Sequence, residues 1–187
     1  KNLKKIGKKT LVELAILSGK NIKEVVDILV STDDKRIFKI AKKAGALVPW
    51  LRPRELSRDD SSSANAALHA LNWYEKCIGK IDGLLLLQPT SPFRTQRTTI
   101  NAIKLFKKNP SKQVVSISYA KKGVINKRKL INGVIYLTSP EKLRKHKTFS
   151  YNDFLPLPIK SKKECIDIDT IEDLKLARNF KHNNLIK

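Results

Sequence analysis

Two aspartates stand one residue apart near the end of the sequence, as Asp167 and Asp169. If this segment is a β-strand, the two side chains share one face about 6.6 Å apart, where paired carboxylates could hold a Mg2+ ion. The alternative is a solvent-facing edge strand with polar alternation, which the spacing alone favours. Two features favour the metal hypothesis: the pair directly precedes Thr170, a candidate helix cap, and adjacent carboxylates repel each other without a cation.

Gln88 ends the apolar run Gly83–Leu87 and is followed by Pro89 and Pro92. Such a run is typical of a strand that is buried on both faces, and its first polar residue then emerges at the carboxyl end. The prolines restrict the backbone that follows, so Gln88 could form part of a preorganised hydrogen-bonding wall. A rigid turn with Gln88 at its rim is an equally good interpretation of these residues alone.

Several polar loop residues could bind a ligand, but each has a simple structural alternative. Arg52 stands between Leu51 and Pro53, where a guanidinium could bind a phosphate or a base carbonyl, although an exposed arginine is the default. The segments 31–34 (STDD) and 61–63 (SSS) could contribute to a site or simply cap the helices that follow them. Position alone does not decide between these alternatives.

The sequence argues against several other classes of protein. It has no G-x-S-x-G motif, no cysteine near a histidine, and only scattered histidines. Cys77 and Cys165 have neither metal nor redox spacing, so we expect two free thiols in a reducing cytoplasm. No apolar run approaches the roughly 20 residues of a membrane span, and no signal-peptide core follows the first lysines, so we expect no membrane partner.

The formal net charge is +22, from 39 lysines and arginines against 17 aspartates and glutamates. A basic nucleic-acid-binding domain is one interpretation, because cationic side chains bind phosphate. The basic residues are spread along the whole chain without interleaved aromatics or a nucleic-acid motif, so we expect a solvated lysine-rich surface and no specific nucleic-acid partner. The charge also favours an anionic substrate.

The hydrophobic periodicity predicts alternating helices and strands. We expect helices over 10–18, 35–44, 63–74, 96–107, 139–145 and 171–180, and strands over 25–30, 47–48, 83–88, 114–118, 134–137 and 166–168. Asn132-Gly133 is a turn signal, and 149–163 is expected to be a proline-containing loop. This order predicts one α/β domain over residues 1–187, with three layers: a mostly parallel sheet and helices on both of its faces.

The motifs occur in an order that resembles the acylneuraminate cytidylyltransferase family, which includes synthetases of CMP-sialic, CMP-legionaminic and CMP-pseudaminic acids. They are K-N-L from Lys1, V-S-T-D-D from Val30, L-R-P from Leu51, D-D-S-S-S from Asp59, H-A-L from His69, L-L-Q-P-T-S-P-F-R ending at Arg94, N-G-V-I-Y from Asn132 and D-I-D-T-x-x-D-L from Asp167. Together they span nearly the whole chain. The resemblance implies a Rossmann-like fold of the nucleotide-diphospho-sugar transferase type.

The resemblance also implies a reaction and a role for individual residues. The anomeric hydroxyl of an acidic nine-carbon (nonulosonic) sugar attacks the α-phosphate of CTP, pyrophosphate leaves, and Mg2+ neutralises charge. By motif position, Lys1 and Asn2 contact the triphosphate, while Arg52 and Ser63 line the cytidine pocket. Gln88 holds sugar hydroxyls. Asp167 and Asp169 carry the metal and, with Lys1, are the catalytic residues. A homodimer is typical of this family.

The sequence departs from the family pattern in two places. Relatives begin with a strand and an R-x-x-S-K-G-x-P loop before the K-N pair, whereas this chain has no Met and begins at Lys1. We therefore expect an N-terminally truncated domain without the phosphate loop or the central strand. Relatives also have a longer dimerisation and sugar-binding lobe where Tyr119–Ile131 stands here. An inactive remnant of the enzyme is thus the alternative hypothesis, and we expect little activity from residues 1–187 alone.

Overall fold

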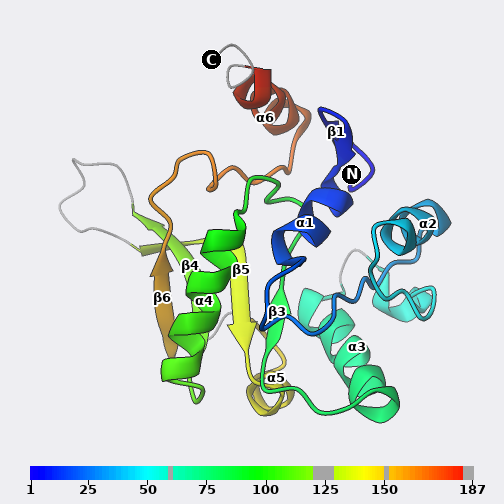
Figure 1. Cartoon of the computed structure of the whole chain (residues 1–187), viewed down its shortest axis with the longest axis vertical. Helices are drawn as coiled ribbons and strands as arrows, with labels where there is room; N and C mark the ends of the chain where they lie inside the picture. Colours follow the sequence, from blue (N-terminus) through cyan, green and yellow to red (C-terminus); the bar gives the residue numbers. More distant parts are fainter. Residues whose placement is uncertain (59–60, 120–128, 150–151, 183–187) are drawn as a thin grey trace.

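The main sheet is mixed. The structure is a computed structural model that describes residues 1–58, 61–119, 129–149 and 152–182. Within them, the sheet contains four strands in the spatial order β3 (Leu84–Leu86), β5 (Lys129–Thr138), β4 (Gln113–Tyr119) and β6 (Phe154–Pro158) (Figure 1). β5 runs antiparallel to both of its neighbours, and β4 pairs in parallel with β6. Three strands therefore share one direction, and the predicted α/β class is confirmed.

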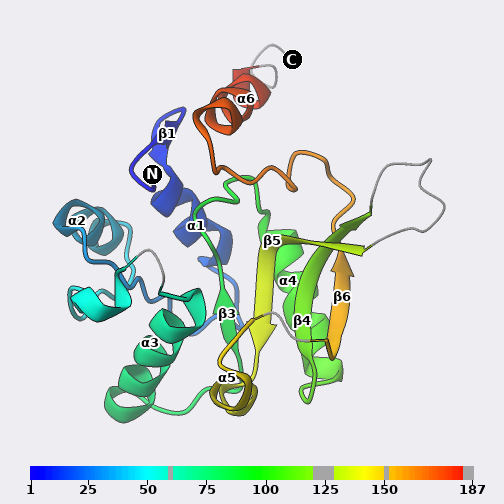
Figure 2. The same cartoon turned by 180° about the vertical axis from the view of Figure 1, so that it is seen from behind.

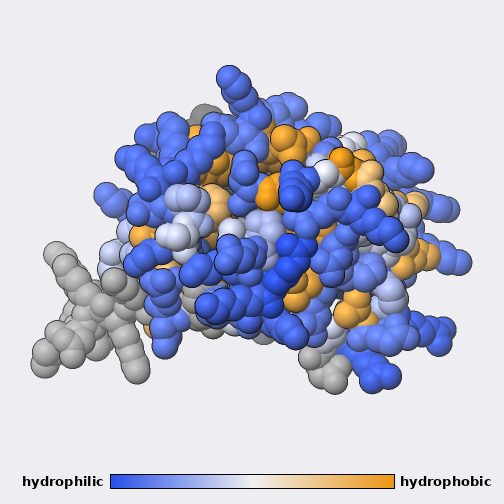
Figure 3. All heavy atoms as spheres, turned by 90° about the horizontal axis from the view of Figure 1, so that it is seen from below, coloured by the Kyte–Doolittle hydropathy of each residue, from blue (hydrophilic) through white to orange (hydrophobic). Residues whose placement is uncertain are grey.

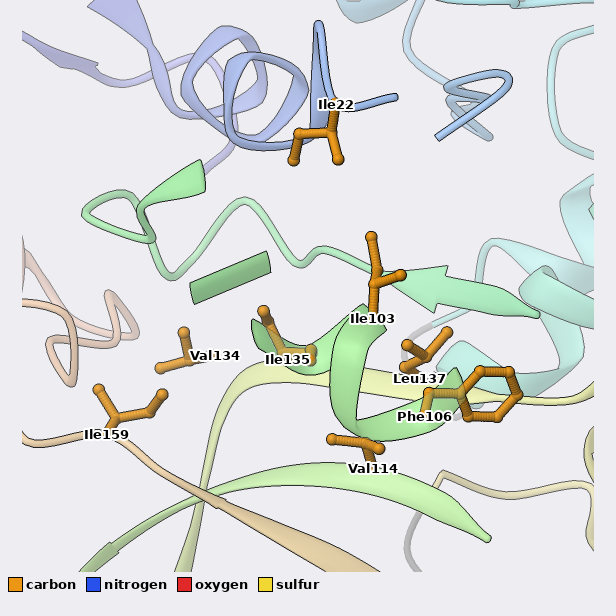
Figure 4. Packing of buried hydrophobic residues seen from close by; sticks show 9 residues of the cluster. Ile22, Ile103, Phe106, Val114, Val134, Ile135, Leu137 and Ile159 are labelled. Carbon is orange, nitrogen blue, oxygen red and sulfur yellow. The ribbon is translucent and has the colours of Figure 1, made fainter. Parts of the chain in front are cut away.

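Helix α4 (Gln96–Lys108) covers one face of the sheet and lies in front of it in Figure 1. Its predicted amphipathic face buries Ile103 and Phe106 against side chains of β4 and β5, as the close view in Figure 4 shows. Val114 of β4 and Ile135 of β5 are both fully buried in this cluster. The largest hydrophobic cluster of the described residues therefore lies between α4 and the sheet.

Helices α3 (Ser63–Cys77) and α5 (Pro140–His146) cover the opposite face, which Figure 2 shows from behind. The leucines at the end of β3 pack against both faces of the sheet, because alternate side chains of a strand point in opposite directions. Leu85 and Leu87 pack with the α4 cluster, whereas Leu84 and Leu86 pack with α3 and α5. This arrangement confirms the predicted three layers.

A further group of elements packs beside β3. Helices α1 (Leu11–Gly19) and α2 (Lys35–Lys43) share a cluster with the extended segments 28–30 and 47–48. The predicted strands over 25–30 and 47–48 are reduced to a single parallel bridge between Leu29 and Leu47. Two backbone hydrogen bonds form this bridge, from Val30 N–H to the Leu47 carbonyl at 2.9 Å and from Leu47 N–H to the Ile28 carbonyl at 2.7 Å. In the described part of the chain neither segment extends into a regular strand.

The helix starts are set by local caps, which the sequence predicted for α2, α3 and the last helix. Thr10 and Glu13 form a reciprocal capping box at α1, and Asp34 and Ser62 accept backbone N–H groups at the starts of α2 and α3. Before α1 lies a short hairpin of β1 (Lys5–Ile6) and β2 (Lys9–Thr10), and the 3-10 helix η1 (Arg54–Leu56) precedes α3. The last helix, α6 (Ile171–His182), begins after Thr170, whose hydroxyl accepts the Asp173 N–H at 3.1 Å.

The predicted turn at Asn132-Gly133 is wrong, because both residues lie inside β5. Val115 faces Tyr136 and Ile117 faces Ile131, so two steps along β4 correspond to five along β5. The extra residues form a bulge in which Gly133 has a φ of 70°. A tight hairpin turn and this bulge both contain a residue with positive φ, which glycine adopts readily. The Asn-Gly pair is therefore compatible with either structure, and here it forms the bulge.

The loop predicted over 149–163 is also wrong in part, because it contains β6. The sequence predicted a loop because it contains Pro156 and Pro158, and proline cannot donate a hydrogen bond to a sheet ladder. β6 stands at the end of the strand order, and the Ile159 N–H donates to the Ile117 carbonyl at 2.8 Å. The prolines occupy the alternate positions, whose nitrogens face away from β4. An edge strand tolerates them in this register.

Hydrophilic residues dominate the face of the molecule that Figure 3 shows from below. Apolar residues form separate small groups on this face. Within the described ranges, none of the helices is long and apolar enough to cross a membrane. The shortened lobe that the sequence predicts falls mostly on residues 120–128, which lie outside the described residues.

Candidate active site

A cavity of about 170 Å3 opens beside the end of β3, and we call it the Gln88 cavity. Its described lining residues come from the start of α3, the end of β3, β5 and the segment after α5: Ser62, Ser63, Ala64, Leu86, Gln88, Tyr136, Lys147, Thr148 and Phe149. Ser63 and Gln88, predicted from their motifs to bind nucleotide and sugar respectively, therefore line the same cavity.

Regular elements position this cavity's walls. Ser62 is the N-cap of α3 and accepts the Asn65 N–H at 3.2 Å, so Ser63 begins the helix with its N–H directed toward the open end. Tyr136 lies on β5, and its ring packs against Phe149 with centroids 5.8 Å apart. The cavity thus has an aromatic and aliphatic side opposite polar groups.

The bulge in β5 lies close to Gln88. A Cβ atom added at Gly133 would stand 3.6 Å from Gln88 Oε1, which is ordinary van der Waals contact. The Asn132 side chain accepts the Val134 N–H at 3.3 Å and stabilises the local turn of the backbone. The bulge therefore lies beside the Gln88 side chain.

Arg94 lies beneath this region and is 5% exposed. Its guanidinium donates to the Val134 carbonyl at 2.5 Å, the Gln88 carbonyl at 3.0 Å and the Ser18 hydroxyl at 3.2 Å. Burial lowers the pKa of Arg94 to about 10, although the carboxylates of Asp167 and Glu164 act against the shift. Arg94 remains charged at neutral pH and joins the β5 bulge, the strand end and α1.

Asp167 is held close to the Gln88 cavity but not on a strand. The strand predicted over 166–168 is wrong, because this segment makes one backbone bond, from Ile168 N–H to the Thr90 carbonyl at 2.9 Å, instead of a ladder. Asp167 Oδ1 is buried and has no hydrogen-bond partner among the described residues. Its charge reaches Tyr136, whose pKa is raised first by burial and then by Asp167.

Lys1 and Asp169 meet in a second cavity of about 180 Å3, which we call the Lys1 cleft. Lys1 Nζ lies 2.7 Å from Asp169 Oδ1, with the two side chains 41% and 71% exposed. The Asn2 carbonyl accepts the Val12 N–H at 3.3 Å, which fixes the N-terminal segment to the start of α1. Ile168, which stands between the two aspartates in the sequence, is buried and also lines this cleft.

Arg52 stands apart from both cavities. Its backbone N–H donates to the Thr32 carbonyl at 2.7 Å, and its guanidinium contacts Ser57 at 3.2 Å and Asp33 at 3.4 Å. Arg52 is therefore attached to the 31–34 turn, as the motif order suggests. It is not among the described residues that line either cavity, whereas Ser63 lines the Gln88 cavity.

Comparison with known proteins places the chain in a family. A family model described as cytidylyltransferase matches residues 1–157. The CMP-N,N'-diacetyllegionaminic acid synthase of Legionella pneumophila is 30% identical over 213 residues, which cover 98% of this chain and 90% of that protein. The chain belongs to the cytidylyltransferase family. The resemblance predicted from the motifs is thereby confirmed, and the chain is an acylneuraminate cytidylyltransferase-like enzyme by family.

Two further comparisons agree with this assignment. The N-acylneuraminate cytidylyltransferase of Escherichia coli is 38% identical over 96 residues, covering 51% of this chain and 22% of that protein. Among solved structures, a CMP:2-keto-3-deoxy-manno-octonic acid synthetase complexed with CTP has a TM-score of 0.74 at 13% identity, covering 98% of this chain and 92% of that one. The second likeness shows the cytidylyltransferase fold.

Motif reasoning missed several residues that surround the candidate site of this cytidylyltransferase. Tyr136 and Arg94 belong to recognised motifs, but nothing in their local spacing indicates that one lines the cavity and the other lies beneath it. Lys147 and Phe149 belong to none of the motifs. They reach the Gln88 cavity because Gln113 Nε2 donates to the Phe149 carbonyl at 2.6 Å and ties this segment to β4. That contact spans 36 residues and has no local signal.

Proposed function

We propose that this chain transfers the CMP group of CTP to a nonulosonic acid and releases pyrophosphate. The observation that carries the proposal is the Gln88 cavity, in which Ser63 and Gln88 face the same space. Nucleotidyl transfer requires the sugar hydroxyl and the α-phosphate to meet, and effective positioning supplies much of its rate. A nucleotide residue and a sugar residue in one cavity satisfy that requirement.

The comparisons support the substrate classes. The Legionella pneumophila relative, whose match covers 98% of this chain, is named for CMP-N,N'-diacetyllegionaminic acid. A structural neighbour was solved in complex with CTP. The net charge of +22 suits two negatively charged substrates. We therefore assign CTP as the nucleotide and an acidic sugar of this type as the acceptor.

In the proposed reaction, a bond forms between the anomeric oxygen and the α-phosphorus while the bond from that phosphorus to the bridging oxygen breaks. The hydroxyl proton passes to solvent and pyrophosphate departs. Gln88 orients the sugar through its side-chain amide. Arg94 fixes the position of this residue by donating a hydrogen bond to the Gln88 backbone carbonyl. Lys1 supplies positive charge to the triphosphate, exchanging its present partner Asp169 for phosphate oxygens.

Asp167 and Asp169 are the residues that would hold Mg2+. The buried Asp167 Oδ1 lacks a hydrogen-bond partner among the described residues, which suits an oxygen ligand for a cation. No group of three or more acidic, histidine or cysteine side chains in the described ranges could hold a metal. Mg2+ commonly uses one or two carboxylates together with substrate phosphates and water, so the pair fits. When bound, Mg2+ neutralises charge on the phosphates.

The test is CTP-dependent release of pyrophosphate with a nonulosonic acid and Mg2+. We expect Asp169→Ala to reduce the rate at least about 100-fold, because charge stabilisation of this kind is worth several kcal/mol. Asp153→Ala is the matched control, since Asp153 is exposed and paired with Lys112 at 3.0 Å, and it should leave the rate unchanged.

Two results would overturn the proposal: no release from this chain or from the product of its complete reading frame, or full activity in Asp169→Ala. If only the product of the complete reading frame turns over, residues 1–187 are an incomplete form of the enzyme.

A further inference from the structure

Lys147 is a charged residue of the Gln88 cavity that the roles above leave unused. Among the described residues that line this cavity, it alone carries a full charge at neutral pH; the others are apolar, hydroxyl-bearing or amide side chains. No ion pair between Lys147 and a carboxylate occurs within the described ranges. Within these ranges, no carboxylate therefore competes for Lys147 with an anion that enters the cavity.

The backbone on both sides of Lys147 is fixed. Lys147 ends α5 in the left-handed conformation, with a φ of 51°, and its N–H donates to the carbonyl of the buried Leu143 at 2.8 Å. Two residues later, the buried Phe149 packs on Tyr136 and accepts a hydrogen bond from Gln113. The exposed Lys147 side chain thus extends from an anchored position at the cavity's rim.

The composition of the cavity favours a carboxylate over a triphosphate. Polyphosphate binding relies on several cations and backbone amides, whereas the described lining offers one lysine. The N-terminal turn of α3 adds a partial positive charge to the same space. Leu86, Tyr136 and Phe149 form an apolar side that suits the carbon skeleton of a sugar acid.

We propose that Lys147 binds the carboxylate of the acidic sugar and selects for it, an inference that rests on the proposed function. In a 2-ulosonic acid the carboxylate is attached to the anomeric carbon, whose hydroxyl is the nucleophile. A cationic side chain that lines the same cavity as Ser63 and Gln88 is therefore suited to bind this carboxylate where the sugar and nucleotide meet. Binding the carboxylate there fixes the orientation of the attacking hydroxyl.

The experiment compares N,N'-diacetyllegionaminic acid with its methyl ester by isothermal titration calorimetry on the purified chain. We expect the chain to bind the acid about tenfold more tightly than the ester, because a charge-assisted hydrogen bond is lost in the ester. Lys147→Gln should reduce the preference to about twofold or less. Lys147→Asn should do the same and keeps the test valid if the first variant folds poorly, since Asn tolerates the left-handed conformation. Lys145→Gln, an exposed lysine of α5 outside the cavity, should retain the full preference.

Each other result overturns the inference. An unchanged acid preference in both Lys147 variants, or no binding of the acid by the parent chain, excludes the carboxylate site. A loss of CTP affinity with an intact acid preference assigns Lys147 to phosphate instead. The pyrophosphate assay separates the two proposals: release with an unchanged preference overturns only the role of Lys147, whereas a Lys147-dependent preference without release overturns only the transferase function.

Discussion

The two cavities of the candidate site are built in different ways. The Gln88 cavity has walls from α3, β3 and β5, with the buried Arg94 holding the Gln88 carbonyl. The Lys1 cleft depends on one exposed ion pair, Lys1 with Asp169, and on helix ends. A cavity built on packed elements is preorganised, whereas exposed pairs exchange partners easily. We infer that the Gln88 cavity is rigid, and that the Lys1 cleft, where we propose that the phosphates and Mg2+ bind, acquires its final geometry from the substrate.

The largest expected effect comes from removing the support of the rigid side. Arg94→Ala leaves the Val134 and Gln88 carbonyls without their buried donor and Asp167 without its compensating charge. We expect a loss of about 3 kcal/mol or more in the free energy of unfolding, measured by urea denaturation.

The control for this prediction is Arg97→Ala, on the exposed side of α4, which should change the free energy of unfolding by less than about 0.5 kcal/mol. If both variants unfold at the same urea concentration, the Gln88 cavity does not depend on Arg94, and the contrast between the two cavities fails.

A smaller effect is expected at the β5 bulge. Gly133→Ala forces a side chain into the left-handed region at φ 70°, so we expect a cost of about 1–2 kcal/mol in thermal or urea denaturation. The new Cβ would make only ordinary contact with Gln88, so the cost is conformational. Gly133→Asn should cost less, because Asn enters this region more readily. Equal costs for the two substitutions would contradict the conformational explanation.

Acid should loosen the Lys1 cleft before the Gln88 cavity. Hydrogen bonds from Thr10 hold the pKa of Glu13 below its usual value, and those from Thr170 do so for Asp173. A lowered native pKa means that the stabilisation is fully present above the unfolded value near 4, and is lost as pH falls through the native value. Both carboxylates cap helices beside the cleft, whereas no carboxylate is among the described lining residues of the Gln88 cavity.

Amide hydrogen exchange below pH 4 measures this difference. We expect protection of the first turns of α1 and α6 to decline before that of β4 and β5, and Thr10→Ala to remove the pH dependence at α1. Uniform loss of protection across these elements would show that the two regions unfold as one unit.

The smallest effect is expected for the exposed ion pair. Lys1→Ala should lower the free energy of unfolding by no more than about 1 kcal/mol, because both partners are solvated and screened by salt. The difference should diminish further in high salt. A loss as large as that of Arg94→Ala would make the Lys1 cleft a rigid part of the fold.

The sequence predicts the parts of the fold that depend on local chemistry. Asp34 and Ser62 cap their helices as expected, since a capping side chain and the backbone N–H group that it binds lie within a few residues. β6 was missed because its strand character comes from a parallel partner about 40 residues away, while its prolines argue against a strand. The strand over 166–168 was predicted from alternation alone, and Ile168 is buried there without a ladder.

In the candidate site, too, residues in local motifs could be predicted, whereas residues placed by tertiary contacts could not. Ser63, Gln88 and the two aspartates were found because they occur in motifs, and their roles stay predictions. Lys147 and the buried Arg94 were missed as site residues, because their importance comes from tertiary placement. Mg2+ and the homodimer typical of the family stay predictions from the resemblance, and a cytoplasmic location stays a prediction from the cysteines.

The prolines of β6 affect the tendency of the protein to aggregate through the edge of its sheet. At an exposed sheet edge, free backbone N–H groups can recruit a strand from another chain and begin fibre growth. Pro156 and Pro158 present no such donors on the outer side of β6. A neighbouring chain would find acceptors there but no ladder to complete. The two prolines that argued against a strand in the sequence therefore also disfavour aggregation through this edge of the sheet.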